Sequence, residues 1–429
     1  METAAFAPAR PGERLAHIDV IRGLALFGVL VMNVHFHFRG PMERFIIDPH
    51  PFEGFWNGVT DNALRLLVEG KAMTLFSMLF GVGLALQLER KEASGGGFWG
   101  FAWRRMGALF GFGMLHVLLL WYGDVLALYA VDGVLLFAFL KRRTRTLHIW
   151  LACMASLMAL AVLVMVGNRL AHIGAFQADQ AKAAGELQAR VAWLIDGYLQ
   201  PGWMDGTVFR ITHYLQEAGD QIAGIILAFF NLFLGLVIWR SGLLRAPAEH
   251  LATLRRAAFW LFALGLPAGL LRLYSRDLYE IVIRTGGWSK GVLFPAALLQ
   301  VFSHHILALA YGAALLLLWQ RPRWQAFLRP FAFVGRMALT HYLAQSLVMG
   351  AVFFGWGLGL YGKVGPLAGL AMCVVLYAAQ IAASRWWLQR FQFGPVEWLW
   401  RCLSYARLQP FRLRAPAPAL DASILPTSP

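Results

Sequence analysis

Polar and titratable residues stand at both ends of the first long apolar segment. Asp19 and Arg22 precede a run of about ten apolar residues, and Asn33, His35 and His37 follow it. Asp19 and Arg22 are three positions apart and therefore share one helix face. Arg22 and Asn33 return to nearly the same face after eleven positions, roughly 16 Å apart along the axis. A guanidinium at one membrane boundary could bind an anion, and imidazoles at the other could transfer protons near neutral pH.

A second apolar segment repeats this spacing. In RRMGALFGFGMLH, Arg105 and His116 are again eleven positions apart. Gly107 and Gly111 form a pair of small residues that predicts close packing of this helix on a neighbour. For His116 taken alone, a role in helix packing is the favoured interpretation, and the repeated spacing on two helices makes a functional stripe an equal alternative.

Further polar residues stand at predicted membrane boundaries. Glu69 and Lys71 flank a glycine before the second apolar run, either as an ordinary ion pair at a helix start or as part of a site. Asp124 lies in the turn after the third run, where it could cap the next helix or orient a histidine. Arg336 and His341 begin the ninth run, and ionisable residues inside a membrane face a cavity or a partner by default.

The composition is typical of a protein with many membrane-spanning helices. Hydrophobic residues make up 59% of the 429 residues and charged residues 14%, with a mean hydropathy of +0.57. A soluble domain carries about a quarter charged residues. The three cysteines are far apart and match no zinc or disulfide pattern, so no metal site is expected. The net charge of +15 is explained by cytoplasmic loops and anionic lipid, and we expect no nucleic-acid partner.

Ten apolar runs predict an all-α, polytopic membrane helix bundle of about ten transmembrane helices. They are 17–36, 68–88, 104–121, 123–140, 147–166, 220–239, 257–273, 291–319, 334–355 and 364–388. With the N-terminus inside, 24 Lys and Arg residues fall on inner segments and 13 on outer segments, and Arg22 inside the first helix completes the 38. This distribution predicts that both termini are cytoplasmic.

The chain is expected to form one transmembrane domain over residues 1–400. Residues 401–429 are predicted to be a cytoplasmic tail, partly disordered because of its prolines. The longest polar segment, 168–218, lies outside in this topology, and either an amphipathic lid or a solvated connector fits its composition.

Five motifs in order resemble the YeiB-like family of bacterial inner-membrane proteins, known as domain of unknown function 418. They are IDVIRGLALFGVLVMN, EGKAMTLFSMLFGVGLAL, RRMGALFGFGMLHVLLLWYGDVLALYAVDG, GRMALTHYLAQS and FGPVEWLWRCLSY. The family looks related to a wider superfamily of transmembrane acyltransferases. That likeness implies transfer of an acyl group, expected to be acetyl, from acyl-CoA in the cytoplasm to a glycan or small-molecule acceptor outside.

The resemblance also implies site residues. The opening Asp19-x-x-Arg22-Gly-x-Ala is shared with the sugar O-acetylating branch and the heparan-glucosaminide branch. The former branch has histidine eleven positions after the arginine, where this chain has Asn33, as the latter branch does. The latter branch implies a catalytic-type histidine before a Trp-Asn-Gly-x-Thr sequence. His50 precedes such a sequence here, at Trp56–Thr60, with a spacing that differs by a few residues.

On this reading, histidines remove a proton from the acceptor, carboxylates orient them, and an amide stabilises the oxyanion. The expected catalytic group is His35, His37, His50, His116, Asn33, Asp124 and Glu69. The expected substrate-binding group is Asp19, Arg22, Arg105, Lys71, Arg336 and His341.

We expect acyl-CoA as a co-substrate, no bound cofactor, the lipid bilayer as a partner and the bacterial inner membrane as the location, with a homo-oligomer left open. Two other functions fit the same residues. One is a transporter or flippase for a small anionic metabolite or a lipid-linked precursor. The other is a histidine-ligated haem protein, for which His304 or His305 could supply one ligand.

Overall fold

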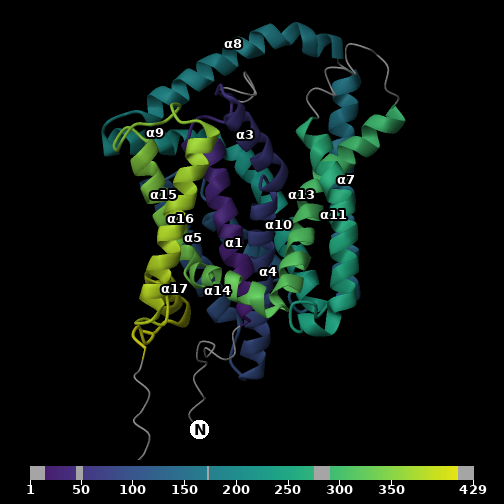
Figure 1. The fold of residues 1–429 in the computed structure, drawn as a ribbon, viewed down its shortest axis with the longest axis vertical. Helices are drawn as coiled ribbons and strands as arrows, with labels where there is room; N and C mark the ends of the chain where they lie inside the picture. Colours follow the sequence, from purple (N-terminus) through teal and green to yellow (C-terminus); the bar gives the residue numbers. More distant parts are fainter. Residues whose placement is uncertain (1–14, 45–51, 172, 275–289, 414–429) are drawn as a thin grey trace, which may run out of the picture.

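The computed structural model describes residues 15–44, 52–171, 173–274 and 290–413, which form an all-helical bundle (Figure 1). The first half contains α1 (Ala16–Asn33), the π-helical turn η2 (Val34–Phe38), α3 (Phe55–Leu67), α4 (Lys71–Ala93), α5 (Trp99–Leu119), α6 (Leu126–Leu136), α7 (Thr144–Ala171) and α8 (Ile173–Tyr198). The second half contains α9 (Trp203–Gln216), α10 (Ala218–Arg240), η3 (Pro247–His250), α11 (Leu251–Leu273), α13 (Lys290–Trp319), α14 (Pro322–Arg336), α15 (Ala338–Phe353), α16 (Pro366–Leu388) and α17 (Pro395–Tyr405).

Seven helical stretches in the described part of the chain are long and apolar enough to cross a membrane. They are Ala16–Phe38, Phe55–Ala93, Thr144–Met165, Ile222–Arg240, Pro247–Leu273, Phe302–Trp319 and Pro366–Leu388. Two shorter apolar helices, α6 and α15, accompany them. Each of the ten apolar runs read from the sequence coincides with a helix, because only helices satisfy their own backbone hydrogen bonds inside lipid.

The two ends of the bundle are built differently. The start of α1 lies at one end together with α14 and α17, which we call the basal end (Figure 1). Helices α3, α8 and α9 lie across the opposite end, which we call the lid end (Figure 1). The segment 168–218 thus forms mainly α8 and α9, and α9 contacts α5 and α10. Helix α17 runs across residue 400, where the sequence placed the start of the tail, and residues 414–429 lie outside the described residues.

Two glycines allow α1 and α14 to touch through their backbones. A Cβ atom at Gly335 would lie 1.9 Å from the carbonyl oxygen of Asp19, and one at Gly23 would lie 2.1 Å from that of Phe331. No side chain fits at either position, so the sequence brings the first turns of α1 against the end of α14. This crossing places Arg22 and Arg336 at the same cavity.

Gly107 and Gly111 do not face another helix within the described chain. No atom lies within 4 Å of a Cβ placed at either glycine, among the residues that the structure describes. Gly113 makes the close approach on α5 instead, because its Cβ would lie 2.4 Å from the amide nitrogen of Ala127 and 2.6 Å from Oδ2 of Asp124. The α5–α6 contact therefore forms one turn before His116.

Candidate functional site

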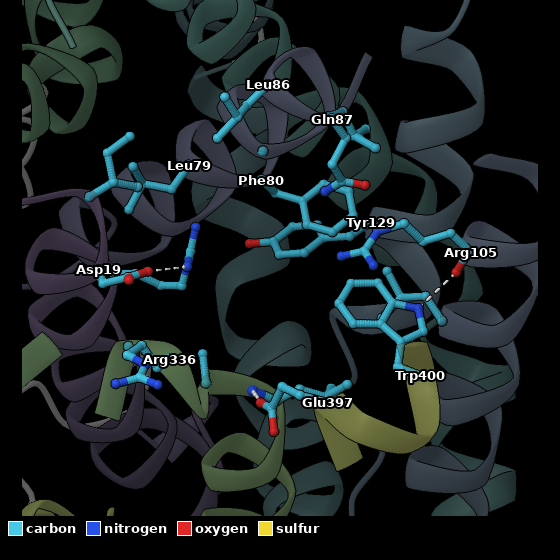
Figure 2. Close-up of a pocket in the computed structure, with 18 of the residues that line it drawn as sticks. Asp19, Leu79, Phe80, Leu86, Gln87, Arg105, Tyr129, Arg336, Glu397 and Trp400 are labelled. Atoms are coloured by element: carbon cyan, nitrogen blue, oxygen red, sulfur yellow. Dashed lines mark hydrogen bonds and ion pairs between the residues drawn. The ribbon is translucent and has the colours of Figure 1, made fainter. Parts of the chain in front are cut away.

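A cavity of about 280 Å³ lies in the basal half of the bundle, between α1, α4, α5, α6, α14, α15 and α17 (Figure 2). Its charged lining residues are Asp19, Arg22, Arg90, Arg105, Arg336, Glu397 and Arg401. Five guanidinium groups thus face two carboxylates. Arginine is always charged and can bind phosphate through two parallel hydrogen bonds, so this lining favours an anionic ligand.

The predicted pair on α1 is present in this lining. Arg22 donates a hydrogen bond of 2.8 Å to Oδ1 of Asp19, and their side chains are 28% and 15% exposed. The pair occupies one face of the helix, as the three-residue spacing predicts. An ion pair with this exposure contributes little to stability, so its position at the cavity is the more informative feature.

Arg105 approaches the cavity from α5, on the side opposite Asp19 (Figure 2). Its guanidinium lies over the ring of Trp400, 3.5 Å from the centroid, and Trp400 Nε1 donates to the carbonyl oxygen of Arg105. The Nε atom of Arg105 is buried without a hydrogen-bond partner among the described residues. The cation–π contact fixes the plane of this side chain while leaving donor capacity for a ligand.

Glu397 on α17 is occupied by the start of α15. Its Oε1 accepts hydrogen bonds from the amides of Leu339 at 2.6 Å and Thr340 at 3.0 Å, and its Oε2 accepts one from the hydroxyl of Thr340. Burial raises the pKa of Glu397, against these hydrogen bonds, which favour the carboxylate. An anion at a helix N-terminus is a favourable arrangement, and this carboxylate is therefore committed to α15 rather than to the arginines.

Beyond the arginines, the cavity wall becomes apolar and aromatic. It includes Phe76, Phe80 and Tyr129, together with Leu126 and Tyr342. The ring of Tyr342 separates the cavity from His116, with the two ring centroids 5.0 Å apart. Arg105 and His116 are eleven residues apart on α5, so the charged part of the cavity and the histidine are separated by roughly 16 Å of helix.

His116 is the centre of a buried hydrogen-bonded chain. Its Nδ1 lies 2.9 Å from Oδ1 of Asp124, and its Nε2 lies 2.8 Å from Oγ of Ser346 on α15. The side chains of His116 and Asp124 are 0% and 1% exposed. Oδ2 of Asp124 also accepts a hydrogen bond from the amide of Ala127, in the first turn of α6, as the predicted cap would.

The partners limit the direction of this chain. A carboxylate only accepts hydrogen bonds, so Nδ1 of His116 donates to Asp124. When the ring is neutral, Nε2 is an acceptor and can receive the hydroxyl proton of Ser346, whose Oγ also lies 3.4 Å from the carbonyl oxygen of Tyr342. The sequence predicted His116 and Asp124 individually; Ser346 has no role in that prediction, because 230 residues separate it from His116.

The two histidines of η2 point to different partners. Nε2 of His35 lies 2.8 Å from Oδ1 of Asp61 on α3, and Asp61 accepts a hydrogen bond of 2.9 Å from Nε of Arg65. Nδ1 of His37 lies 3.1 Å from the hydroxyl of Tyr122. The π-helical turn therefore joins α1 to two different elements. Asp61 and Arg65 are four positions apart on an amphipathic helix. This spacing could have predicted their ion pair from the sequence.

Other predicted site residues lie away from the cavity. Glu69 pairs with Arg272 at 3.0 Å, and Nζ of Lys71 donates to the carbonyl oxygen of Arg65. Gly70 between them has φ +73°, and its Cβ would meet the ring of His304 at 2.5 Å. These contacts tie α3, α4, α11 and α13 together, and Glu69 pairs with Arg272 rather than with Lys71.

Three predicted site residues remain: His341, Asn33 and His50. Nε2 of His341 bonds to Oγ of Ser384 on α16, so His341 faces away from the cavity that its neighbour Tyr342 lines. Asn33 is half-buried at the last residue of α1. His50 lies outside the described residues. No group of three metal-ligating side chains occurs in the part of the chain that the structure describes.

A buried histidine also joins the two lid helices. Nδ1 of His213 on α9 lies 2.8 Å from the hydroxyl of Tyr198 at the end of α8. Its ring stacks near that of Tyr122, with centroids 4.0 Å apart. Burial first, then the charge of Arg190 and the nearby His37, lower the pKa of His213 to about 3. The ring is therefore neutral near pH 7.

The sequence profile of the family described as "Protein of unknown function (DUF418)" matches residues 238–407. "Uncharacterized protein YxaH" of Bacillus subtilis (strain 168) is 31% identical over 417 residues, which cover 95% of this chain and 98% of that protein. "Uncharacterized protein YeiB" of Escherichia coli (strain K12) is 28% identical over 424 residues, covering 95% and 99%. No solved structure matches significantly. The end-to-end similarity to YxaH and the profile match show that this chain belongs to the YeiB-like, DUF418 family of proteins.

Proposed function

We propose that this protein transfers an acyl group from an acyl-CoA, bound at the basal end, to a hydroxyl or amine of an acceptor that arrives from the lid end. One observation carries the proposal: a cavity lined by five arginines leads through an apolar channel wall to Tyr342, directly behind which lies the Asp124–His116–Ser346 chain. On this proposal, the anion-binding groups would lie at one end of the cavity and the proton-transferring groups just beyond the other.

The cavity suits the parts of an acyl thioester in order. The phosphates would bind near the mouth, where Arg22, Arg105 and Arg336 supply forked donors. The narrow arm and the acyl group would lie along the apolar wall formed by side chains such as Phe80 and Tyr129. The thioester carbon would then lie toward Tyr342 and His116, and away from water at the basal end.

His116 would act as the general base. Asp124 holds the ring in the tautomer that leaves Nε2 free to accept a proton. Histidine suits this role because its ordinary pKa is near 6.5, close to working pH. His35 and His37 hold helices at the lid end and do not share the hydrogen bonds of His116 that the structure describes, so we assign the chemistry to His116 alone.

We also propose that the basal end faces the cytoplasm of a bacterial inner membrane. The excess of Lys and Arg on the segments of that end supports this orientation. Acyl-CoA made in the cytoplasm would then enter the cavity directly, and the acceptor, a glycan or a small molecule, would be on the outer face.

Calorimetric titration of the purified, detergent-solubilised protein with CoA and acetyl-CoA tests the donor site. Arg22→Gln should weaken binding at least tenfold, about 1.4 kcal/mol, because it removes a charge-assisted contact. His116→Ala should bind CoA as the wild type does. Arg390→Gln is the matched control, since Arg390 is an exposed arginine near the basal end that is not in the cavity lining.

Each outcome has a clear meaning. Binding that is unchanged in Arg22→Gln would remove the role assigned to that residue. No binding of CoA to the wild type at millimolar concentration would contradict the proposal and favour transport of another small anion, because charged residues along a membrane cavity also mark a substrate path. Flux of an anion into liposomes without an acyl donor would then be the measurement to make.

A further inference from the structure

Ser346 completes an acid–base–hydroxyl chain whose geometry is that of an activated nucleophile. Its Oγ lies 2.8 Å from Nε2 of His116, and Nδ1 of His116 lies 2.9 Å from Asp124. A serine hydroxyl becomes a nucleophile when an adjacent base accepts its proton and a third group orients the base. With a neutral ring, the tautomer set by Asp124 leaves Nε2 unprotonated and 2.8 Å from Oγ of Ser346, which supplies both conditions.

Building on the acyltransferase function proposed above, we propose that Ser346 itself carries the acyl group between donor and acceptor. Its Oγ forms a bond to the thioester carbon, the carbon–sulfur bond breaks, and the hydroxyl proton passes through Nε2 of His116 to the departing thiolate. The products are an acyl-serine ester and free CoA thiol. In the second half, the acceptor hydroxyl or amine attacks the ester, and its proton returns through His116 to Oγ of Ser346.

The position of Ser346 on α15 connects it to the donor cavity. Ser346 is four residues after Tyr342 and therefore lies one turn farther along the same helix face. Tyr342 lines the cavity, and its hydroxyl contacts Val125 N and Gly123 O only at 3.4 Å. These hydrogen bonds are long and therefore weak. Tyr342 is held mainly by packing, since the residue is 2% exposed in the core, and the acyl group would reach Ser346 only when this ring moves aside.

The same helix offers an internal comparison. His341, also on α15, bonds through Nε2 to Ser384 on α16, and Ser384 donates to the carbonyl oxygen of Gln380. No carboxylate contacts His341 among the described residues. Ser384 is thus a buried serine on a histidine that lacks the orienting acid, and Ser384→Ala serves as the matched control for Ser346→Ala.

Incubation of the purified protein with radiolabelled acetyl-CoA, in the absence of acceptor, tests the inference. Denatured wild-type protein should retain close to one acetyl group per chain, located by mass spectrometry on the peptide that contains Ser346. The label should be absent in Ser346→Ala and His116→Ala, and unchanged in Ser384→Ala. Ser346→Cys keeps a nucleophile of similar size, and its label should become sensitive to neutral hydroxylamine, as a thioester is.

A second probe separates this inference from the donor proposal. An alkyl fluorophosphonate reacts with activated serines without any CoA, so it should modify Ser346 and spare Ser384. Acetyl transfer to an acceptor at the wild-type rate in Ser346→Ala would overturn the inference and leave an acyltransferase with direct transfer. Failure of the wild type to bind acetyl-CoA, together with fluorophosphonate labelling of Ser346, would remove the donor assignment and keep the nucleophile. Folded wild-type protein that neither reagent modifies would overturn the inference.

Discussion

The basal end and the lid end of the bundle use charged residues in opposite ways. At the basal end, five arginines and two carboxylates line a partly open cavity, and the Asp19–Arg22 pair there is partly exposed. At the lid end, two histidine–aspartate pairs, His116–Asp124 and His35–Asp61, are buried. Arginines that line a cavity can bind an anionic ligand, whereas buried pairs hold helices together and are costly to break. Substitutions should therefore affect mainly binding at one end and mainly stability at the other.

The largest effect is expected for Asp124→Ala. The substitution removes the partner of His116 Nδ1 and of the Ala127 amide, and both donors stay buried. We expect a loss of about 3 kcal/mol in the free energy of unfolding, measured by SDS titration in mixed micelles.

Asp19→Ala is the matched substitution at the basal end. It also removes a carboxylate from a hydrogen-bonded pair, but the pair is partly exposed. We expect a loss below about 1 kcal/mol. Equal losses for Asp19→Ala and Asp124→Ala would contradict the difference between the two ends.

The lid end should also lose stability in acid. The pKa of His213 is about 3 in the folded protein, below its ordinary value of 6.5. Because the pKa of His213 is lower in the folded than in the unfolded protein, the folded state is favoured fully above pH 6.5. This contribution to the free energy of unfolding is lost as the pH falls from 6.5 toward 3. Arg190 and His37 oppose protonation, while Glu217, 3.6 Å from Nε2, favours it.

At pH 5 the free energy of unfolding should be lower than at pH 7 by at most about 2 kcal/mol because of His213. The difference in unfolding free energy between pH 7 and pH 5, measured for the wild type and for His213→Gln, isolates this histidine from the others. The variant should show the smaller difference. Identical differences would mean that His213 is not responsible for the acid sensitivity.

Much of this architecture follows from local sequence, because helices and i,i+3 pairs depend on near neighbours. The ten apolar runs coincide with helices, and Asp19 and Arg22 pair as their spacing predicts. The amphipathic helices α14 and α17 were not predicted, since neither has an apolar run long enough to read as a span.

The contacts within the site were harder to predict from the sequence. Ser346 reaches His116 across 230 residues, and Glu397 reaches the start of α15 across 58. Such contacts depend on the crossing of helices rather than on spacing along the chain. Gly107 and Gly111 show the converse limit, because a small-residue pattern allows a close approach but does not say which helix makes it.

Glu397→Gln should have an intermediate effect at the basal end. An amide keeps one oxygen but presents an NH₂ group where the carboxylate now accepts from Leu339, Thr340 and the Thr340 hydroxyl. The loss should be about 1 kcal/mol, typical of a removed helix cap. Thermal unfolding of the variant measures it, and CoA affinity should change less than in Arg22→Gln. A larger change in CoA affinity than in Arg22→Gln would place Glu397 in the ligand site instead.

Asp132 on α6 should give the smallest effect, and it tests the pairing argument most directly. Asp132 is fully buried, like Asp124, but neither of its carboxylate oxygens has a hydrogen-bond partner among the described residues. Asp132→Asn has nearly the same shape and removes no hydrogen bond, so the free energy of unfolding should change by less than about 0.5 kcal/mol or increase. A loss as large as that of Asp124→Ala, in the same SDS titration, would show that burial alone sets the cost. The difference between the two ends would then reflect depth in the bundle and not the pairing of acids with bases.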